Sequence, residues 1–279
     1  MSRPEKQTVS CPKCGEPIEF TLWHSINTDM PNAIDDIISG KLFEVECKKC
    51  GHKTHVNYPI LFNDMIHQVM IYNAIPDNAK ETEEALDSMK KLYPGRTRIV
   101  LDQSTLREKT SIFNAGLDDR VTEILKLIVM AQLQEQLNGK KLMGVYFIPG
   151  DEPAFEVALE EGSGYVPVTM EMYNNIAQQF QKQLTAGDEE YYIDQDWALS
   201  FLSSPENQLQ YIYAMKNAHW IQKTHLFRAD EFVCSACGAS FSKPYQLCPA
   251  CKVQMKKTKY DPSWVDEAEG LSALLDDDW

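Results

Sequence analysis

Cys11-Pro12-Lys13-Cys14-Gly15 is a Cys-x-x-Cys turn followed by glycine, and Cys47-Lys48-Lys49-Cys50-Gly51 repeats it after an interval of 32 residues. Two thiolates at this spacing lie on one tight turn, and two such turns supply the four sulfur ligands of a structural zinc site. The glycine allows the backbone a positive φ angle after the second cysteine. A single Cys-x-x-Cys can be a redox pair, but a redox pair needs no second matching turn. The repeat therefore predicts a zinc site.

The same pattern returns near the C-terminus, where Cys234-Ser235-Ala236-Cys237-Gly238 is followed after 10 residues by Cys248-Pro249-Ala250-Cys251. All eight cysteines of the chain thus fall into two sets of four, and we expect two bound Zn²⁺ ions. Four thiolates fill the coordination shell, so each ion would be structural rather than catalytic. Iron in a rubredoxin-like site uses similar turns and remains an alternative. The expected metal ligands are Cys11, Cys14, Cys47, Cys50, Cys234, Cys237, Cys248 and Cys251.

Composition and length are those of a globular protein. The chain has 279 residues, of which 43% are hydrophobic and 24% are charged, enough for one or two domains and a small module. It shows no signal-like N-terminus and no apolar run of the ~18 residues that a membrane span requires. Reduced, metal-paired cysteines without a signal segment indicate the cytoplasm. We therefore expect a cytoplasmic protein with no membrane contact.

The formal net charge of −14 disfavours broad binding to nucleic acid, because phosphate contacts need clustered lysine and arginine. The charge is uneven, however. Residues 234–260 hold five lysines and no acid, and residues 261–279 hold seven acids and no base. The lysines that nucleic acid would contact are Lys243, Lys252, Lys256, Lys257 and Lys259. A small basic module is thus followed directly by an acidic tail.

Hydrophobic patterning predicts an α+β fold. Residues 8–23 read as a strand, a metal turn and a strand, in which Ile18, Phe20 and Leu22 follow the strand period. A short helix at residues 31–39, ended by Gly40, enlarges the loop before the second metal turn. Further strands are expected at residues 52–58, 65–75, 98–101, 143–148, 155–160, 165–168 and 191–194, and further helices at 78–92, 105–116, 118–138, 172–187 and from 204 onward.

These elements group into a zinc ribbon built into a mixed α/β body, with a small zinc ribbon added at the C-terminus. The N-terminal domain would span residues 1–130 and contain the first ribbon at residues 7–58. The body would continue as α+β structure through residues 131–225. Residues 226–260 would form the second ribbon. Residues 261–279 would form an acidic amphipathic tail, because Trp264, Leu271 and Leu275 recur at helical spacing.

Histidines and carboxylates near the metal turns give weaker signals. His24, His52 and His55 could assist the thiolates, but with four cysteines present we expect them at the surface or beside the ligands. Asp64 and His67 could form a general-base pair. On a strand, side chains three apart face opposite sides, which favours a structural role for both.

The segment after the second long helix is acidic and aromatic. Asp188-Glu189-Glu190, with Asp194 and Asp196, could hold a hard cation. No glycine-containing loop with the spacing of a metal site accompanies these acids, so a solvated surface run is the better interpretation. Core packing or a protein interface is expected for the aromatic residues Tyr191, Tyr192, Trp197, Tyr211, Tyr213 and Trp220.

Several motifs together resemble one known family. They are Cys11-Pro12-Lys13-Cys14, Trp23-His24-Ser25-Ile26-Asn27, Cys47 and Cys50 with Gly51, Tyr58-Pro59, Asp64, Met70-Ile71-Tyr72, Leu106-Arg107-Glu108-Lys109, Ile112-Phe113 and Gly116-Leu117-Asp118-Asp119-Arg120-Val121. Over residues 7–130 the chain resembles the CpXC family, named for the first of these motifs. The resemblance implies a bacterial, zinc-binding domain with four cysteine ligands, and it supplies no catalytic residue.

These observations favour a non-catalytic zinc-binding adaptor or accessory protein that acts through macromolecular contacts, mainly with proteins. Two alternatives remain. The lysine-bearing second ribbon could make the chain a nucleic-acid-binding accessory factor. An unrecognised active site in residues 60–225 could make it an enzyme, which only the geometry of a pocket would reveal.

Overall fold

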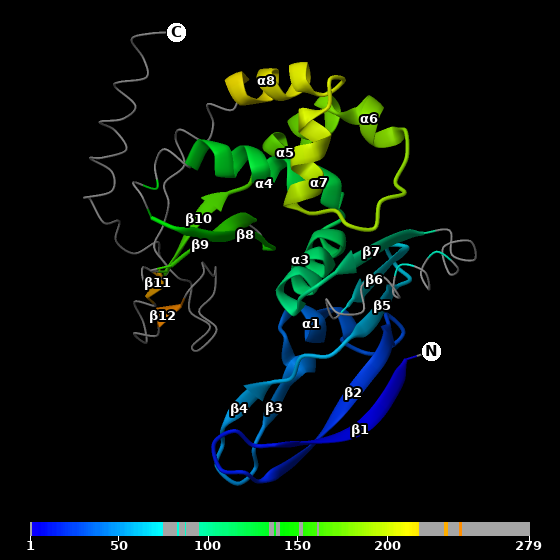
Figure 1. Cartoon of the computed structure of the whole chain (residues 1–279), viewed down its shortest axis with the longest axis vertical. Helices are drawn as coiled ribbons and strands as arrows, with labels where there is room; N and C mark the ends of the chain where they lie inside the picture. The colour runs from blue at the N-terminus through cyan, green and yellow to red at the C-terminus, as the bar shows by residue number, and fades with distance from the viewer. Residues whose placement is uncertain are drawn as a thin grey trace. The chain divides into compact units, whose positions relative to one another are not determined.

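Figure 1 shows the computed structural model, in which the chain folds as two compact units. The first unit combines Met1–Arg120 with Gln183–Trp197, and the second combines Val121–Lys182 with Ala198–Trp279. The structure describes residues 2–74, 95–133, 140–150, 153–160 and 162–217, together with Glu83, Asp87, Leu137, and the paired strands β11 (Phe232–Val233) and β12 (Ser240–Phe241). Sheets and helices alternate through both units, which confirms the predicted α+β class.

A five-stranded sheet forms the centre of the first unit, in the order β1-β2-β5-β6-β7. The β1–β2 and β5–β6 pairs are antiparallel, whereas β2–β5 and β6–β7 are parallel. The bounds are β1 (Arg3–Ser10), β2 (Pro17–Asn27), β5 (Ile60–Asp64), β6 (Val69–Asn73) and β7 (Arg96–Val100).

The β1–β2 hairpin extends well beyond this sheet, as the blue strands in Figure 1 show. Strand β2 pairs with β5 only through Ser25, Ile26 and Asn27. The rest of β2 therefore forms a two-stranded ribbon with the exposed strand β1. A second hairpin, β3 (Glu44–Glu46) and β4 (Lys53–His55), lies beside the far end of this ribbon. Its Val45 packs with Ile18 of β2, so the predicted first zinc ribbon consists of two neighbouring hairpins.

Helices α1 (Ala33–Ile38) and α3 (Gln103–Asn114), with the short 3₁₀ helix η1 (Lys41–Phe43), complete the core of the first unit. Gly40 ends the predicted insert helix at a φ of 76°. Asp102 caps α3, because its carboxylate accepts a hydrogen bond from the Thr105 amide at 2.8 Å. The buried core is made of Ile26, Ala33, Ile37, Phe43, Tyr58, Ile60, Phe62, Val69, Ile71, Val100, Leu106 and Phe113.

The strand predicted at residues 65–75 begins only at Val69, where β6 starts, so the prediction is wrong for residues 65–68. The chain instead makes a hairpin, in which β5 and β6 flank a turn at residues 65–68. Gln68 adopts a φ of 54° there, a left-handed conformation that ends strand geometry. Val69 and Ile71 nevertheless point into the core as their spacing predicted.

The second unit holds a three-stranded antiparallel sheet in the order β10-β9-β8, made of β8 (Leu142–Ile148), β9 (Ala154–Leu159) and β10 (Gly162–Pro167). These strands lie close to the predicted ranges. Phe147 and Phe155 pack edge to face at 6.2 Å between ring centroids. The helices that begin in or cross into this unit are α4 (Asp119–Leu133), α5 (Met170–Gln179), α6 (Gln181–Thr185), α7 (Gln195–Ser203) and α8 (Gln208–Asn217).

Two predictions for residues 172–203 are wrong. The expected single helix to Gly187 is split into α5 and α6 at Phe180. The expected strand at 191–194 is not a strand, because Asp194 accepts a hydrogen bond from the Trp197 amide at 2.9 Å and starts α7. Tyr191 and Tyr192 pack against Ala74 and Ile99 of the first unit's sheet, in agreement with the expected packing role.

Three other predictions lie outside the described residues: most of the helix at 78–92, the four-cysteine set of the second ribbon with its lysines, and the tail at 261–279. Within the part that is described, no helix combines the length and apolar character needed to cross a bilayer.

Candidate metal centre

Four cysteines from two turns meet at the far end of the ribbon. Cys11 and Cys14 lie on the turn between β1 and β2, and Cys47 and Cys50 lie on the turn between β3 and β4. The four Sγ atoms are all within 4.8 Å of one another. The Sγ atoms of Cys11 and Cys50 are 3.6 Å apart, as are those of Cys14 and Cys47. Four converging thiols are the donor set of a structural zinc site.

The two turns have the same backbone geometry. The amide of Cys11 donates to the carbonyl of Glu16 at 2.8 Å, and the amide of Cys47 donates to that of His52 at 2.8 Å. The glycine after each second cysteine donates back to the carbonyl of the first, with φ angles of 73° for Gly15 and 67° for Gly51. Both turns require glycine there because residues with a side chain rarely adopt this conformation.

The protonation of the cluster depends on charge. Burial raises the pKa of Cys11, but the amides of Cys14 and Lys13 and the neighbouring thiols lower it to about 7. The Glu16 amide lowers the pKa of Cys14, but desolvation and the three other cysteines raise it to about 12. The opposite directions of these shifts indicate that the cluster loses a first proton more easily than a second. A divalent cation bound at the centre would stabilise the further thiolates.

Lys49 offsets negative charge at the cluster. Its ammonium group lies 2.6 Å from a carboxylate oxygen of Glu16 on the other turn. This hydrogen bond is the main cause of a raised pKa of Lys49, and the negative charges of Cys14, Cys47 and Cys50 raise it further. The pair therefore links the two turns beside the metal ligands.

The nearby histidines are not part of the donor set. His24 contacts Glu5 at 2.6 Å, His52 contributes its backbone carbonyl, and His55 is exposed on β4. Among the residues that the structure describes, the four cysteines form the one cluster of three or more metal-type side chains. The second predicted set, Cys234, Cys237, Cys248 and Cys251, lies outside those residues.

Asp64 and His67 do lie together, contrary to the expectation that they face opposite sides. Asp64 is the last residue of β5, and His67 lies in the turn that follows it. One oxygen of the buried Asp64 carboxylate accepts from the amides of Ile66 at 3.0 Å and His67 at 3.1 Å, and the other lies 2.6 Å from His67 Nδ1. The Met65 amide donates to Thr28 Oγ1 at 3.1 Å. The carboxylate thus holds the turn, which is a structural role.

Asp64→Ala should destabilise the first unit by about 1–3 kcal/mol, because two turn amides lose a buried acceptor. Urea unfolding followed by circular dichroism measures this loss. His67→Gln is the matched control, since it keeps the carboxylate and both amide bonds. A loss as large in His67→Gln as in Asp64→Ala would show that the imidazole contact, not the amide bonds, stabilises the turn.

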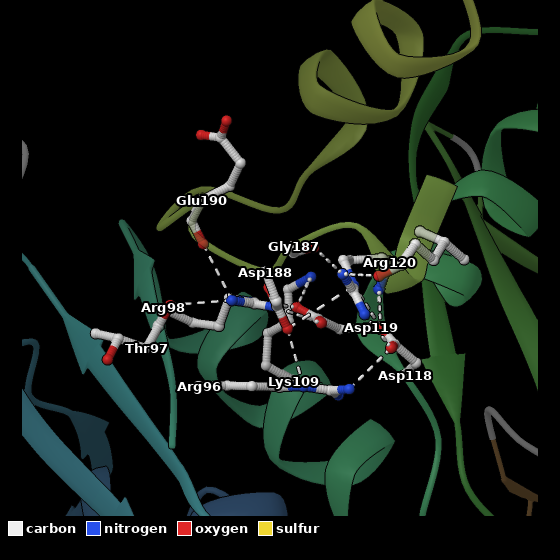
Figure 2. A network of polar contacts seen from close by, with 11 residues as sticks. Arg96, Thr97, Arg98, Lys109, Asp118, Asp119, Arg120, Gly187, Asp188 and Glu190 are labelled. Carbon is white, nitrogen blue, oxygen red and sulfur yellow. Dashed lines mark hydrogen bonds and ion pairs between the residues drawn. The ribbon is translucent and has the colours of Figure 1, made fainter. Parts of the chain in front are cut away.

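Sequence reasoning missed a buried ionic network in the first unit, shown in Figure 2. Arg98 of β7 is fully buried and binds both oxygens of Asp119, at 2.7 and 3.0 Å. Lys109 of α3 lies 3.2 Å from the same carboxylate. Asp188 approaches Arg98 at 2.7 Å and Arg96 at 2.9 Å.

The network also anchors the segment around Asp188. Arg120 donates to the carbonyls of Leu184 at 2.9 Å and Gly187 at 2.7 Å, and Arg98 donates to that of Glu190 at 3.0 Å. Asp188 is therefore not part of a solvated surface run, as the sequence interpretation held, because cations from β7 surround it. The available signal was the Gly116-Leu117-Asp118-Asp119-Arg120 motif, which supplies three of the charged side chains in the network.

Comparison with known proteins agrees with this geometry. Residues 9–126 match the family model described as CpXC protein. Neither the curated proteins nor the solved structures gave a match. The matched segment contains all four clustered cysteines and the acidic start of α4. The segment of residues 9–126 is therefore similar to the CpXC family.

Proposed function

We propose that this protein is a zinc-binding adaptor or accessory factor that acts through macromolecular contacts, mainly with proteins. The observation that carries the proposal is the closed set of four thiols where the two hairpins meet. Such a set leaves no coordination position for a substrate or a reactive water, so its ion serves structure. We infer the same for the second set of four cysteines, which makes two Zn²⁺ ions per chain.

In this arrangement zinc would hold the two hairpins together. The buried cluster that joins the hairpins consists of Cys11, Ile18, Val45 and Cys47, and two of these four are metal ligands. Apart from the ligands, the apolar contact consists of Ile18 and Val45 with the partly buried Val9, Phe20 and Val56 packed against them. So small an apolar contact does not fix a hairpin by itself. Zinc would supply the missing energy and present the ribbon as one stable surface.

Charge at the metal end favours a protein partner over nucleic acid. Lys49 and Lys53 are already paired with Glu16 and Glu44, at 2.6 and 2.7 Å. A zinc tetrathiolate carries a double negative charge, which the remaining exposed lysines of the two turns only offset. A surface without net positive charge gives little of the electrostatic affinity that phosphate backbones require.

Elemental analysis of the purified full-length protein should find two zinc ions per chain. In addition, a partner that the zinc-loaded protein captures should no longer be captured when Cys14 and Cys50 are both replaced by serine. Lys48→Ser on the same turn is the control. Nuclease treatment of the lysate separates protein partners from nucleic acid. Zinc-loaded and zinc-free proteins that capture identical partners would contradict the proposal, and capture abolished by nuclease would favour the nucleic-acid alternative.

A further inference from the structure

The four cysteines differ sharply in their access to solvent. Cys47 is fully buried and Cys11 is 3% exposed, whereas Cys14 is exposed and Cys50 is intermediate. The space at the next residue is also open, because no heavy atom outside the chain neighbours of Gly15 lies within 4 Å of the position that a Cβ on Gly15 would take. A small reactive molecule approaching from solvent therefore reaches Cys14 before the two buried sulfurs.

The nearest sulfur partners lie across the two turns. Cys14 Sγ is 3.6 Å from Cys47 Sγ, and Cys11 Sγ is 3.6 Å from Cys50 Sγ. Disulfide formation requires a second thiolate close to the first oxidised sulfur. Each cysteine has such a neighbour on the opposite hairpin.

We propose that Cys14 is an oxidation site, attacked first by a two-electron oxidant of the peroxide class and then joined to Cys47 in a disulfide. This inference rests on the proposed function, because it takes the four cysteines to be zinc ligands. It adds that oxidation of the cysteines would change how the two hairpins are joined.

The chemistry balances with hydrogen peroxide as the oxidant. In the zinc-loaded protein the metal keeps Cys14 deprotonated. The Cys14 thiolate attacks one peroxide oxygen, the O–O bond breaks, and hydroxide leaves, which converts Cys14 to a sulfenic acid. The Cys47 thiolate then attacks the Cys14 sulfur, the S–O bond breaks, and a second hydroxide leaves. The two sulfurs together lose two electrons, and the peroxide gains them. Two thiolates remain for zinc, and a second peroxide oxidises Cys11 and Cys50 in the same way, so Zn²⁺ is released.

The two disulfides would join the same turns that zinc joins. Because each crosses from one hairpin to the other, Val45 stays against Ile18 after the metal is lost. Oxidation therefore replaces a metal link by covalent links, and a thiol reductant with added zinc restores the first state. The local charge changes meanwhile, since the tetrathiolate is removed while Lys49 remains.

The test treats zinc-loaded full-length protein with increasing hydrogen peroxide and follows two readouts, zinc release to a chromogenic chelator and disulfide mapping by mass spectrometry without reduction. The first disulfide to form should be Cys14–Cys47. The Cys14→His variant keeps four ligands of types that zinc accepts, and its zinc release should be at least about tenfold slower. Cys47→His removes the resolving thiol, so a sulfenic acid should persist on Cys14 and react with a 1,3-dicarbonyl probe.

A first disulfide between Cys11 and Cys14 within one turn, or oxidation that begins on a buried cysteine, would overturn the proposal. Mapping on the unsubstituted chain decides this even if a histidine variant fails to fold. The alkylation rate of each cysteine, measured before any oxidant is added, distinguishes the zinc assignment from the oxidation-site proposal. If chelator does not change the alkylation rates of the four cysteines, the zinc assignment fails; if zinc protects them but Cys14 is not oxidised first, only the oxidation site fails.

Discussion

Replacing Cys47 by serine should abolish stoichiometric zinc at the first site and release the β3–β4 hairpin from the ribbon. Cys47 is fully buried, and its Sγ lies 3.6 Å from that of Cys14. Binding of structural zinc contributes on the order of 10–16 kcal/mol in small metal-dependent domains, and a site with one ligand missing retains little of it. We expect a loss of about 5 kcal/mol or more in local stability at this end of the unit.

This loss of stability should be confined to the metal end of the unit because of the way that β2 is paired. Its Ser25–Asn27 segment belongs to the central sheet, while residues 17–24 belong only to the ribbon. Hydrogen exchange should therefore speed up in β3, β4 and the far part of β1–β2, and stay slow in β5, β6 and β7. Lys48→Ser, on the same turn but not a ligand, should leave exchange and zinc content unchanged. Protection that survives in β3–β4 of Cys47→Ser would show that apolar packing alone holds the hairpin.

Asp119→Asn should destabilise the first unit by about 3–5 kcal/mol. The Asp119 carboxylate is completely buried and compensates both Arg98 and Lys109, each of which is 1% exposed at its side chain. Removing one partner of a buried ionic group leaves the other charges without compensation, and this cost exceeds that of losing a surface pair. Asp36→Asn is the matched control, because Asp36 faces the exposed Lys41 at 3.4 Å and should lose at most about 1 kcal/mol. Urea unfolding at pH 7 gives both values.

The same residue should control acid stability. Burial acts to raise the pKa of Asp119, but Lys109 and Arg98 outweigh it and hold the pKa well below its usual range. A carboxyl with a lowered folded-state pKa contributes stability that is present above its unfolded pKa of about 4 and is lost as the pH falls through the folded value. The stability gap between the native chain and Asp119→Asn should therefore be constant from pH 7 to about 5 and shrink below pH 4. A gap that stays constant down to pH 2.5 would mean that the carboxylate charge is not what stabilises the unit.

The amino-acid sequence by itself predicted which cysteines form the first cluster. The reason is local, since two cysteines three positions apart share one turn, and the glycine after each pair sets the turn's direction. The short helix before Gly40 and the strands around Val145 and Phe155 followed from periodicity in the same local way. That Cys11 and Cys14 meet Cys47 and Cys50 followed because four thiolates complete one zinc site.

Only the tertiary structure decided the fate of the charged and turn residues. Asp188 lies 90 positions from Arg98 in the sequence. A run of acidic residues has the same sequence pattern whether it is surrounded by water or by buried arginines. Asp64 and His67 meet because the carboxylate captures the turn amides, which ends a strand that apolar spacing alone would continue. The unequal exposure of Cys14 and Cys47, and hence the order in which they react, depends on how β3–β4 packs against the ribbon. In each case the deciding energy is desolvation or a contact between distant segments, which no local pattern of residues contains.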